Sequence, residues 1–140
     1  MSIYKYPDSQ ATFTRIAIAP DGVTPYIVYS DGANGYKATV RKYNGTLWEI
    51  VGNALLSAGY AYNTNITFAP DGTPFLSYED GGNGYKITVM KLSENQWVTV
   101  GNPGFSTYSI GANSIAISPN GVPYIAYCEA TSATNSLVVQ

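Results

Sequence analysis

The chain has 140 residues, a length that suits a single domain with a sizeable core. Hydrophobic residues make up 45% of it, which argues against disorder, while 11% charged residues, 14 Gly and 13 Tyr are typical of a β-sheet protein with many tight turns. The net charge of -2 disfavours nucleic acid as a partner, the absence of His excludes a His-based triad, and the single Cys128 excludes an internal disulfide and a cysteine metal cluster.

The N-terminal segment, residues 1–11, contains Lys5, Pro7 and Asp8 and has no apolar core, so we expect no signal peptide. No stretch approaches the roughly 18 consecutive apolar residues of a membrane-spanning helix, so we expect a soluble protein without a membrane partner. Neither observation assigns a cellular compartment.

Short strands are predicted throughout the chain, in an order that repeats. The first strand of each segment is apolar and β-branched, and a Pro-Asp-Gly or Pro-Asn-Gly turn leads to the second, because Pro presets φ and Gly accepts a positive φ. In the first two segments, Asp-Gly-x-Asn-Gly signals the turn before a third strand, and a polar turn precedes a fourth. No window has helical periodicity. The predicted strands are residues 16–19, 26–30, 36–43, 46–51, 66–69, 75–79, 85–92, 96–100, 115–118, 124–128 and 136–140.

The spacing of these strands is the strongest signal in the sequence. The glycines of the first turns, Gly22, Gly72 and Gly121, lie 50 and 49 residues apart, and the first unit has one extra residue. After that residue the register is constant, so that DGANGYK at 31–37 aligns with DGGNGYK at 80–86. Strict repetition of four antiparallel strands favours β-propeller blades over a β-sandwich, whose strand pairs need not repeat in sequence.

The units resemble the blades of six- or seven-bladed β-propellers. The turn and strand Asn44-Gly45-Thr46-x-Trp48 is similar to the fourth strand of lectin-type propellers. The resemblance covers nearly the whole chain and implies the fold, but it says little about activity because propellers include lectins, enzymes and scaffolds. We therefore expect one all-β domain at 1–140. Its repeats are predicted at about 12–61, 62–110 and 111–140, the last being incomplete, with residues 2–10 as the candidate that completes it.

Three blades cannot close a ring, since closed propellers have roughly 4–8 blades. Two chains of three blades would make six, so we expect a C2 homodimer that forms one six-bladed ring. The N-terminal strand would complete the last blade of its own chain or of the partner. Lectins of two repeats that trimerise into six blades are a precedent in the family. The alternative is that the 140 residues are an excised or engineered part of a longer propeller.

Repeated aromatic residues, and the polar turns beside them, are the candidate ligand-binding residues. Aromatic faces stack on sugar rings, and nearby Asn and Asp groups bind hydroxyls, so that repetition would give several weak sites. The competing interpretation is that the rings fill the space between blades and that Asp and Asn shape the turns. The candidates are Trp48, Trp97, Tyr36, Tyr85, Asp31, Asp80, Asn34 and Asn83.

A few further residues depart from the shared pattern. Glu79 stands where the first unit has Ser30, which makes it a better site candidate than an acid that obeys the repeat. Three tyrosines in the predicted long loops are hard to explain as core, namely Tyr60, Tyr62 and Tyr108.

Catalysis and metal binding have little support in the sequence. The oxygen-rich turns lack the ligand count and the bidentate Glu of a complete Ca²⁺ loop, so no metal and no cofactor is expected. Cys128 has no His to activate it, which predicts a buried structural thiol. The sequence therefore predicts a non-enzymatic, lectin-like carbohydrate-binding module, with glycans and a second copy of the chain as partners. The alternative is a structural or protein-interaction propeller without a small-molecule site.

Overall fold

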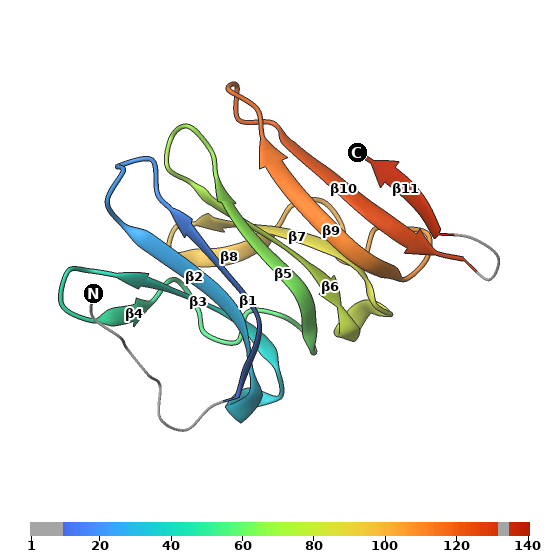
Figure 1. Cartoon of the computed structure of the whole chain (residues 1–140), viewed down its shortest axis with the longest axis horizontal. Helices are drawn as coiled ribbons and strands as arrows, with labels where there is room; N and C mark the ends of the chain where they lie inside the picture. The colour runs from blue at the N-terminus through green and yellow to red at the C-terminus, as the bar shows by residue number, and fades with distance from the viewer. Residues whose placement is uncertain (1–9, 132–134) are drawn as a thin grey trace.

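The computed structural model describes residues 10–131 and 135–140. Their secondary structure consists of strands and two short 3₁₀ turns, so the predicted all-β class is confirmed. The strands form three antiparallel sheets that follow one another along the chain and lie side by side (Figure 1). None of these residues belongs to a helix long and apolar enough to cross a membrane.

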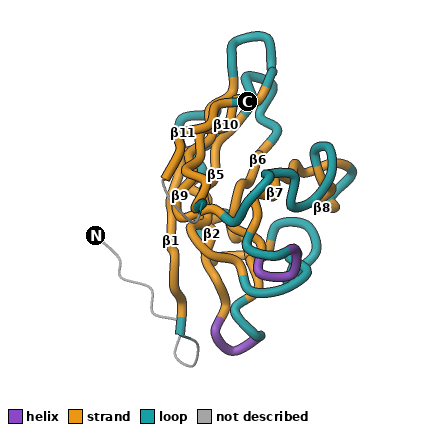
Figure 2. Tube along the Cα trace, turned by 90° about the vertical axis from the view of Figure 1, so that its right-hand side faces the viewer, coloured by secondary structure: helices purple, strands orange, loops and turns teal. Residues whose placement is uncertain are grey.

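Each sheet is built from strands that are consecutive in sequence. Sheet 1 has the order β1 (Ala11–Ile18), β2 (Pro25–Asp31), β3 (Lys37–Tyr43) and β4 (Trp48–Ile50). Sheet 2 repeats this order with β5 (Ala61–Phe68), β6 (Pro74–Asp80), β7 (Lys86–Ser93) and β8 (Gln96–Thr99). The described part of sheet 3 contains β9 (Ile110–Ile117), β10 (Pro123–Ala130) and β11 (Asn135–Val139). The 3₁₀ turns η1 (Gly32–Asn34) and η2 (Gly81–Asn83) lie at strand ends, coloured purple in Figure 2.

The first strand of every sheet is longer than predicted and begins five residues earlier. In β1 and β5 the pairing register shifts within these added residues, where Phe13 and Asn63 adopt left-handed φ angles of 51° and 49°. Such a bulge interrupts the alternation of apolar and polar residues on which strand prediction depends. Tyr62 consequently lies in β5, and its predicted place in a loop is wrong.

Sheet 2 lies between the other two sheets. Its first strand, β5, contacts both β1 and β9. Two backbone hydrogen bonds link neighbouring sheets at equivalent places, from Ala61 N to Tyr36 O at 3.0 Å and from Ile110 N to Tyr85 O at 2.8 Å. Apolar side chains then fill each junction. The junction of sheets 1 and 2 is built around Val28, Val40, Leu76, Tyr78 and Trp97, and that of sheets 2 and 3 around Ile87, Val89, Ile110, Ile125 and Tyr127.

Hydrogen bonds recur between the first two units with the spacing of 49 residues. Val51 N donates to Val40 O at 3.0 Å, and Val100 N donates to Val89 O at 2.8 Å. The repeat bounds, the propeller and the ring completed by a second chain stay predictions. The predicted contribution of residues 2–10 to the last blade falls outside the described residues, except for Gln10.

Candidate functional site

Five aromatic side chains lie in contact where sheets 1 and 2 meet, and we call them the aromatic row. Phe13 belongs to the bulge of β1, and Tyr62 lies near the start of β5, which Tyr60 directly precedes. Tyr36 and Tyr85 follow the 3₁₀ turns and directly precede β3 and β7. The row is therefore assembled from two sheets, and the sheet junction fixes its geometry.

Tyr60 is the centre of the aromatic row. Its ring stacks on that of Tyr36, with centroids 4.5 Å apart and planes at 8°, and on that of Tyr62, at 4.0 Å and 10°. Phe13 meets Tyr62 edge to face at 5.5 Å, and Tyr85 is tilted against Tyr62 at 5.7 Å. Phe13 is 36% exposed and Tyr85 is 48% exposed. These two rings therefore have surface left over for another molecule.

Three residues of the aromatic row have left-handed backbone, which is costly for bulky side chains. The φ angles are 51° at Phe13, 56° at Tyr36 and 61° at Tyr85. Such residues cost of order 1–3 kcal/mol each and persist only where the surroundings hold them. The Thr64 hydroxyl of sheet 2 donates to the Phe13 carbonyl, which fixes the bulge from across the junction. Strained backbone of this kind gathers at ligand sites, where it presents a side chain in a fixed direction.

The predicted Asp and Asn candidates lie in the turns that precede Tyr36 and Tyr85. Asp31 caps η1 by accepting hydrogen bonds from Ala33 N and Asn34 Nδ2, at 3.1 and 3.0 Å. The carboxylate of Asp80 accepts the equivalent bonds from Gly82 N and Asn83 Nδ2, at 3.0 and 2.8 Å, and a further bond from Thr88 Oγ1.

Both carboxylates of these turns are buried, and their oxygens accept hydrogen bonds from within the turns. The four residues Asp31, Asn34, Asp80 and Asn83 therefore shape the turns that present Tyr36 and Tyr85.

The two predicted tryptophans have different surroundings. Trp97 is 5% exposed, and its Nε1 donates to Val51 O at 2.8 Å, so its ring faces are covered by protein. Trp48 is half-buried in the outer strand β4, where its ring lies 5.5 Å from that of Tyr43.

Of the eight predicted candidates, the structure thus brings Tyr36 and Tyr85 together in the aromatic row. Phe13 was missed because it lies in a stretch that was not predicted to be a strand. For Tyr60 and Tyr62 the sequence contained one indication of a site, because neither tyrosine had an obvious role in the core.

Polar groups border the aromatic row. Tyr36 donates from its hydroxyl to Gln10 Oε1 at 2.9 Å. Glu79 lies opposite Tyr62 in the β5–β6 pair and accepts a hydrogen bond from Asn63 Nδ2 at 3.0 Å. Burial raises the pKa of Glu79, and the bond from Asn63 partly offsets this. Desolvation and the neighbouring Tyr85, Tyr60 and Glu79 raise the pKa of Tyr62, so that this phenol stays neutral and can donate a hydrogen bond.

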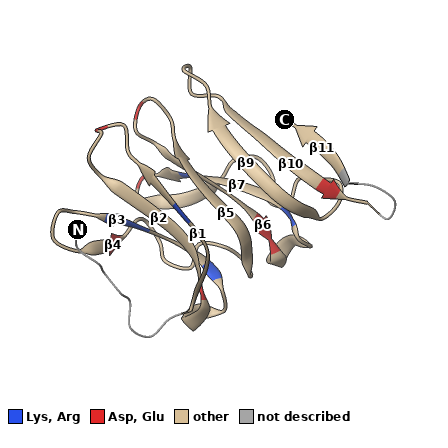
Figure 3. Cartoon of the chain, viewed as in Figure 1, with Lys and Arg blue, Asp and Glu red and all other residues tan. Residues whose placement is uncertain are grey.

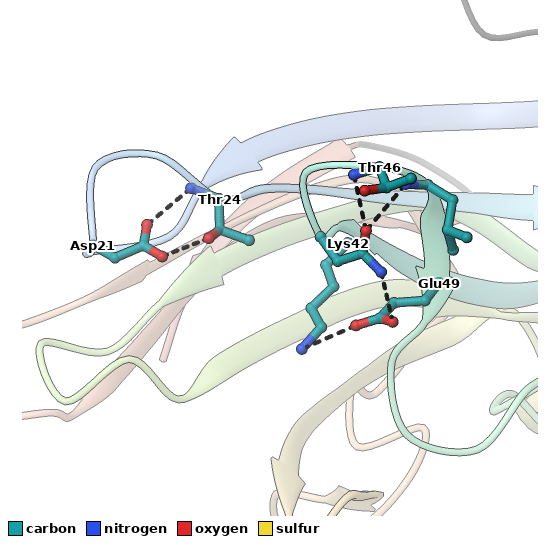
Figure 4. Close-up of polar contacts among 7 residues, drawn as sticks. Asp21, Thr24, Lys42, Thr46 and Glu49 are labelled. Atoms are coloured by element: carbon teal, nitrogen blue, oxygen red, sulfur yellow. Dashed lines mark hydrogen bonds and ion pairs between the residues drawn. The ribbon is translucent and has the colours of Figure 1, made fainter.

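A second candidate is an open cleft of about 400 Å³ in sheet 1, lined by Val23, Thr24, Lys42, Tyr43, Asn44 and Gly45. Its polar groups bond to one another, as Figure 4 shows. Asp21 accepts hydrogen bonds from Thr24 at 2.9 Å (N) and 2.5 Å (Oγ1), and Lys42 Nζ lies 3.4 Å from Glu49 Oε1. The hydrogen bonds from Thr24 lower the pKa of Asp21, as expected for a turn. The cleft is explained by its two turns, so the aromatic row is the better candidate.

Charge does not single out another site. Figure 3 shows the basic and acidic positions of the described residues scattered along the strands and turns of the three sheets. Within residues 10–131 and 135–140, no group of three or more His, Cys, Asp or Glu could hold a metal ion.

The comparisons with known proteins identify a fold and no family. No family model matches the chain. No curated protein matches it either. Among solved structures, the chain is similar to a fucose lectin from Kordia zhangzhouensis, determined in complex with methyl-fucoside. The TM-score is 0.59 at 12% identity, and the match covers 91% of this chain and 91% of the lectin chain. The two chains thus share a fold over nearly their whole length.

Proposed function

We propose that the chain is a non-enzymatic carbohydrate-binding module and that the aromatic row is its sugar site. The observation that carries the proposal is the pair of half-exposed rings, Phe13 and Tyr85, held on left-handed backbone at a sheet junction. The fold is also that of a fucose lectin, which supports the same class of ligand.

In this proposal the apolar C–H face of a sugar packs against the exposed rings of Phe13 and Tyr85. The bordering polar groups bind its hydroxyls. The carboxyl oxygens of Glu79 accept hydrogen bonds, and the phenol of Tyr62 donates one. Because stacking and the bulge already hold the row, little conformational entropy is lost on binding.

We further infer that the three sheets are blades of a β-propeller and that two chains form a six-bladed, multivalent ring. The side-by-side placement of β1, β5 and β9 supports this arrangement. So do the exposed apolar residues on the two outer sheets, such as Ile16 and Ile18 in sheet 1 and Leu137 in sheet 3. Each ring would carry two aromatic rows, which gives avidity on a surface rich in one sugar. A monomer by sedimentation at micromolar concentration would refute the ring.

Methyl-fucoside is the first ligand to titrate, by calorimetry or by NMR, and a glycan array extends the test to other sugars. The variants Phe13→Asn and Tyr85→Asn remove a ring while keeping a residue that tolerates left-handed backbone. We expect each to weaken binding at least about tenfold, equivalent to about 1.4 kcal/mol. Tyr108→Asn is the matched control, because Tyr108 is 51% exposed but lies outside the aromatic row.

Failure of every glycan to bind would remove this function. If the assembly stayed intact in that case, the exposed apolar faces of the outer sheets would favour the alternative, a protein-interaction or structural scaffold.

A further inference from the structure

A cavity of about 160 Å³ opens between sheets 2 and 3, beside the edge strand β11. Its walls are almost entirely apolar, and its volume is close to that of engineered cavities of about 150 Å³ that take up benzene. It therefore has the size and the chemistry for one aromatic ring. Its lining residues are Val89, Val100, Phe105, Ile115, Pro123, Ile125 and Gln140.

Every residue of this lining has an equivalent 49 positions earlier, at the junction of sheets 1 and 2. The equivalents are Val40, Val51, Leu56, Ile66, Pro74, Leu76 and Lys91. Five of them, all except Pro74 and Lys91, belong to the core cluster that contains Trp97. At that junction an aromatic ring occupies the space that is open at the other.

The ring of Trp97 is held there by its own strand. β8 pairs with β7, Trp97 Nε1 donates to Val51 O at 2.8 Å, and Trp97 N donates to Asn53 Oδ1 at 2.8 Å. A Cβ added at Gly52 would lie 2.9 Å from Trp97 Cδ1, whereas one added at the equivalent Gly101 would have no atom within 4 Å. The cavity is thus the open counterpart of the Trp97 site.

The strand that would fill the cavity has a place to pair. In sheet 3, β11 occupies the position of β7, and its outer edge has no partner among the described residues (Figure 1). Leu137 and Val139 on β11 are 72% and 63% exposed. Gln140 and Ile125 exchange backbone hydrogen bonds at 2.9 and 2.8 Å, so the ladder is intact up to the cavity. A free, regular edge of this kind accepts an added strand.

We propose that residues 1–9 of a second copy of this chain pair with β11 and place a tyrosine ring, from Tyr4 or Tyr6, in the cavity. Outside the described residues the sequence has the segments 1–9 and 132–134, and only the first contains aromatic rings. A strand as short as the four-residue β8 is sufficient. The tyrosine hydroxyl can donate to the Val100 carbonyl, as the Trp97 indole does to Val51.

The donor is a second copy because of where the segment leads. Residues 1–9 continue into β1, which belongs to sheet 1, and sheet 2 separates sheet 1 from the cavity. The inference rests on the proposed pairing of two chains and adds to it the identity of the contact.

A cysteine trap tests the contact in the full chain. Both partners carry Cys128→Ser; one carries Lys5→Cys or Pro7→Cys, which keep both tyrosines, and the other carries Gln140→Cys and a mass tag. In the register of β7 and β8 the residue after Trp97 pairs with Lys91, whose equivalent is Gln140, so the residue after the inserted tyrosine should face Gln140. Cross-strand neighbours are close enough for a disulfide. We expect a covalent heterodimer of the summed mass that reductant reverses. Tyr108→Cys in place of Lys5→Cys is the control and should give none.

Each of the other outcomes contradicts one part of the proposal. If the chain dimerises but no cross-link forms, the contact with β11 is contradicted and the six-bladed assembly is not. If the chain is a monomer, both are contradicted. A cross-link within a single chain carrying both cysteines, at a concentration too low for pairing, overturns the second copy as donor.

A second measurement tests the insertion of the tyrosine side chain into the cavity. We expect Tyr4→Ala/Tyr6→Ala to raise the dimer dissociation constant at least about tenfold, which corresponds to about 1.4 kcal/mol, while the matched variant Lys5→Ala leaves it unchanged. The two single variants identify the inserted ring. Equal dissociation constants for the double variant and the original chain contradict the insertion, even where the cross-link forms.

Discussion

At the junction of sheets 1 and 2 the indole of Trp97 belongs to one buried apolar cluster with Val51 and Leu56, whereas at the junction of sheets 2 and 3 the equivalent Val100 and Phe105 line a cavity. The walls are the same kind of apolar residue in both places. The difference lies in the fourth strand, which sheet 2 contains and the described part of sheet 3 does not. A junction in this fold is therefore completed by the outermost strand of the following sheet, not by the two faces alone.

Emptying the filled junction should have the largest effect. Trp97→Ala removes a nearly buried ring and its hydrogen bond to Val51 O, so we expect the free energy of unfolding to fall by about 3–5 kcal/mol. Urea denaturation measures the loss. Trp48→Ala is the matched control, and its half-buried ring should cost less than half as much. Equal losses would show that the two tryptophans have the same surroundings.

A matched pair of glycines measures the crowding at each junction. Gly52 and Gly101 have φ angles of 69° and 74°, so alanine introduces similar backbone strain at both. At Gly52 the new Cβ would also lie 2.9 Å from Leu92 Cδ1 and from Trp97 Cδ1. We expect Gly52→Ala to destabilise by about 1–3 kcal/mol more than Gly101→Ala. Thermal unfolding of both variants gives the difference, and its absence would mean that Trp97 does not lie over Gly52.

Removing the hydrogen bond between Asn53 and the backbone of Trp97 should lower the stability by less. Asn53 Oδ1 accepts a hydrogen bond from Trp97 N at 2.8 Å, so Asn53→Ala should cost about 0.5–1.5 kcal/mol. The equivalent Asn102 is exposed, and Asn102→Ala should leave the stability of the isolated chain unchanged. If a partner strand occupies the second junction, Asn102→Ala should instead weaken dimerisation, which sedimentation detects.

The smallest expected effect is on the pH dependence of stability. One junction has the titratable Glu79 where the other has the hydroxyl of Ser30. Ser30 donates to Ala61 O at the first junction, and the equivalent Glu79 accepts from Asn63, which also contacts Gly111 of sheet 3. Burial raises the pKa of Glu79 above that of the unfolded chain. Its stabilising contribution is therefore present below the unfolded pKa and is lost as pH rises through the folded pKa.

We expect Glu79→Gln to be more stable than the original chain at neutral pH, and this advantage to vanish in acid. Turn hydrogen bonds lower the pKa values of Asp21 and Asp71, so these residues make stability rise with pH. They do so equally in the original chain and in the variant. The difference in melting temperature between Glu79→Gln and the original chain, measured from acid to neutral pH, therefore reports the contribution of Glu79 alone. A stability difference that does not change with pH would contradict the assignment.

The sequence predicted the turns and the second strands well because their signals are local. Residues 26–30 were predicted as a strand, and β2 spans Pro25–Asp31, since Pro and Gly mark both ends. The early halves of β1 and β5 were missed because the bulges at Phe13 and Asn63 break the alternation.

Burial was harder to predict than local structure. Trp48 and Trp97 are equivalent in sequence, yet only Trp97 has a neighbouring sheet to cover it. For the candidate site, the pattern found Tyr36 and Tyr85. It did not find the stack around Tyr60, which depends on how two sheets meet.

The backbone bonds that tie Ala61 to Tyr36 and Ile110 to Tyr85 have a consequence for cooperativity. Sheet 2 takes part in both links and in both apolar junctions, so it cannot open without loosening its neighbours. Either outer sheet can open while the other two remain packed. Stability in such nearest-neighbour arrays is graded along the chain. Amide hydrogens of the buried strand β6 should therefore exchange slowest, and those of β1 and β11 fastest.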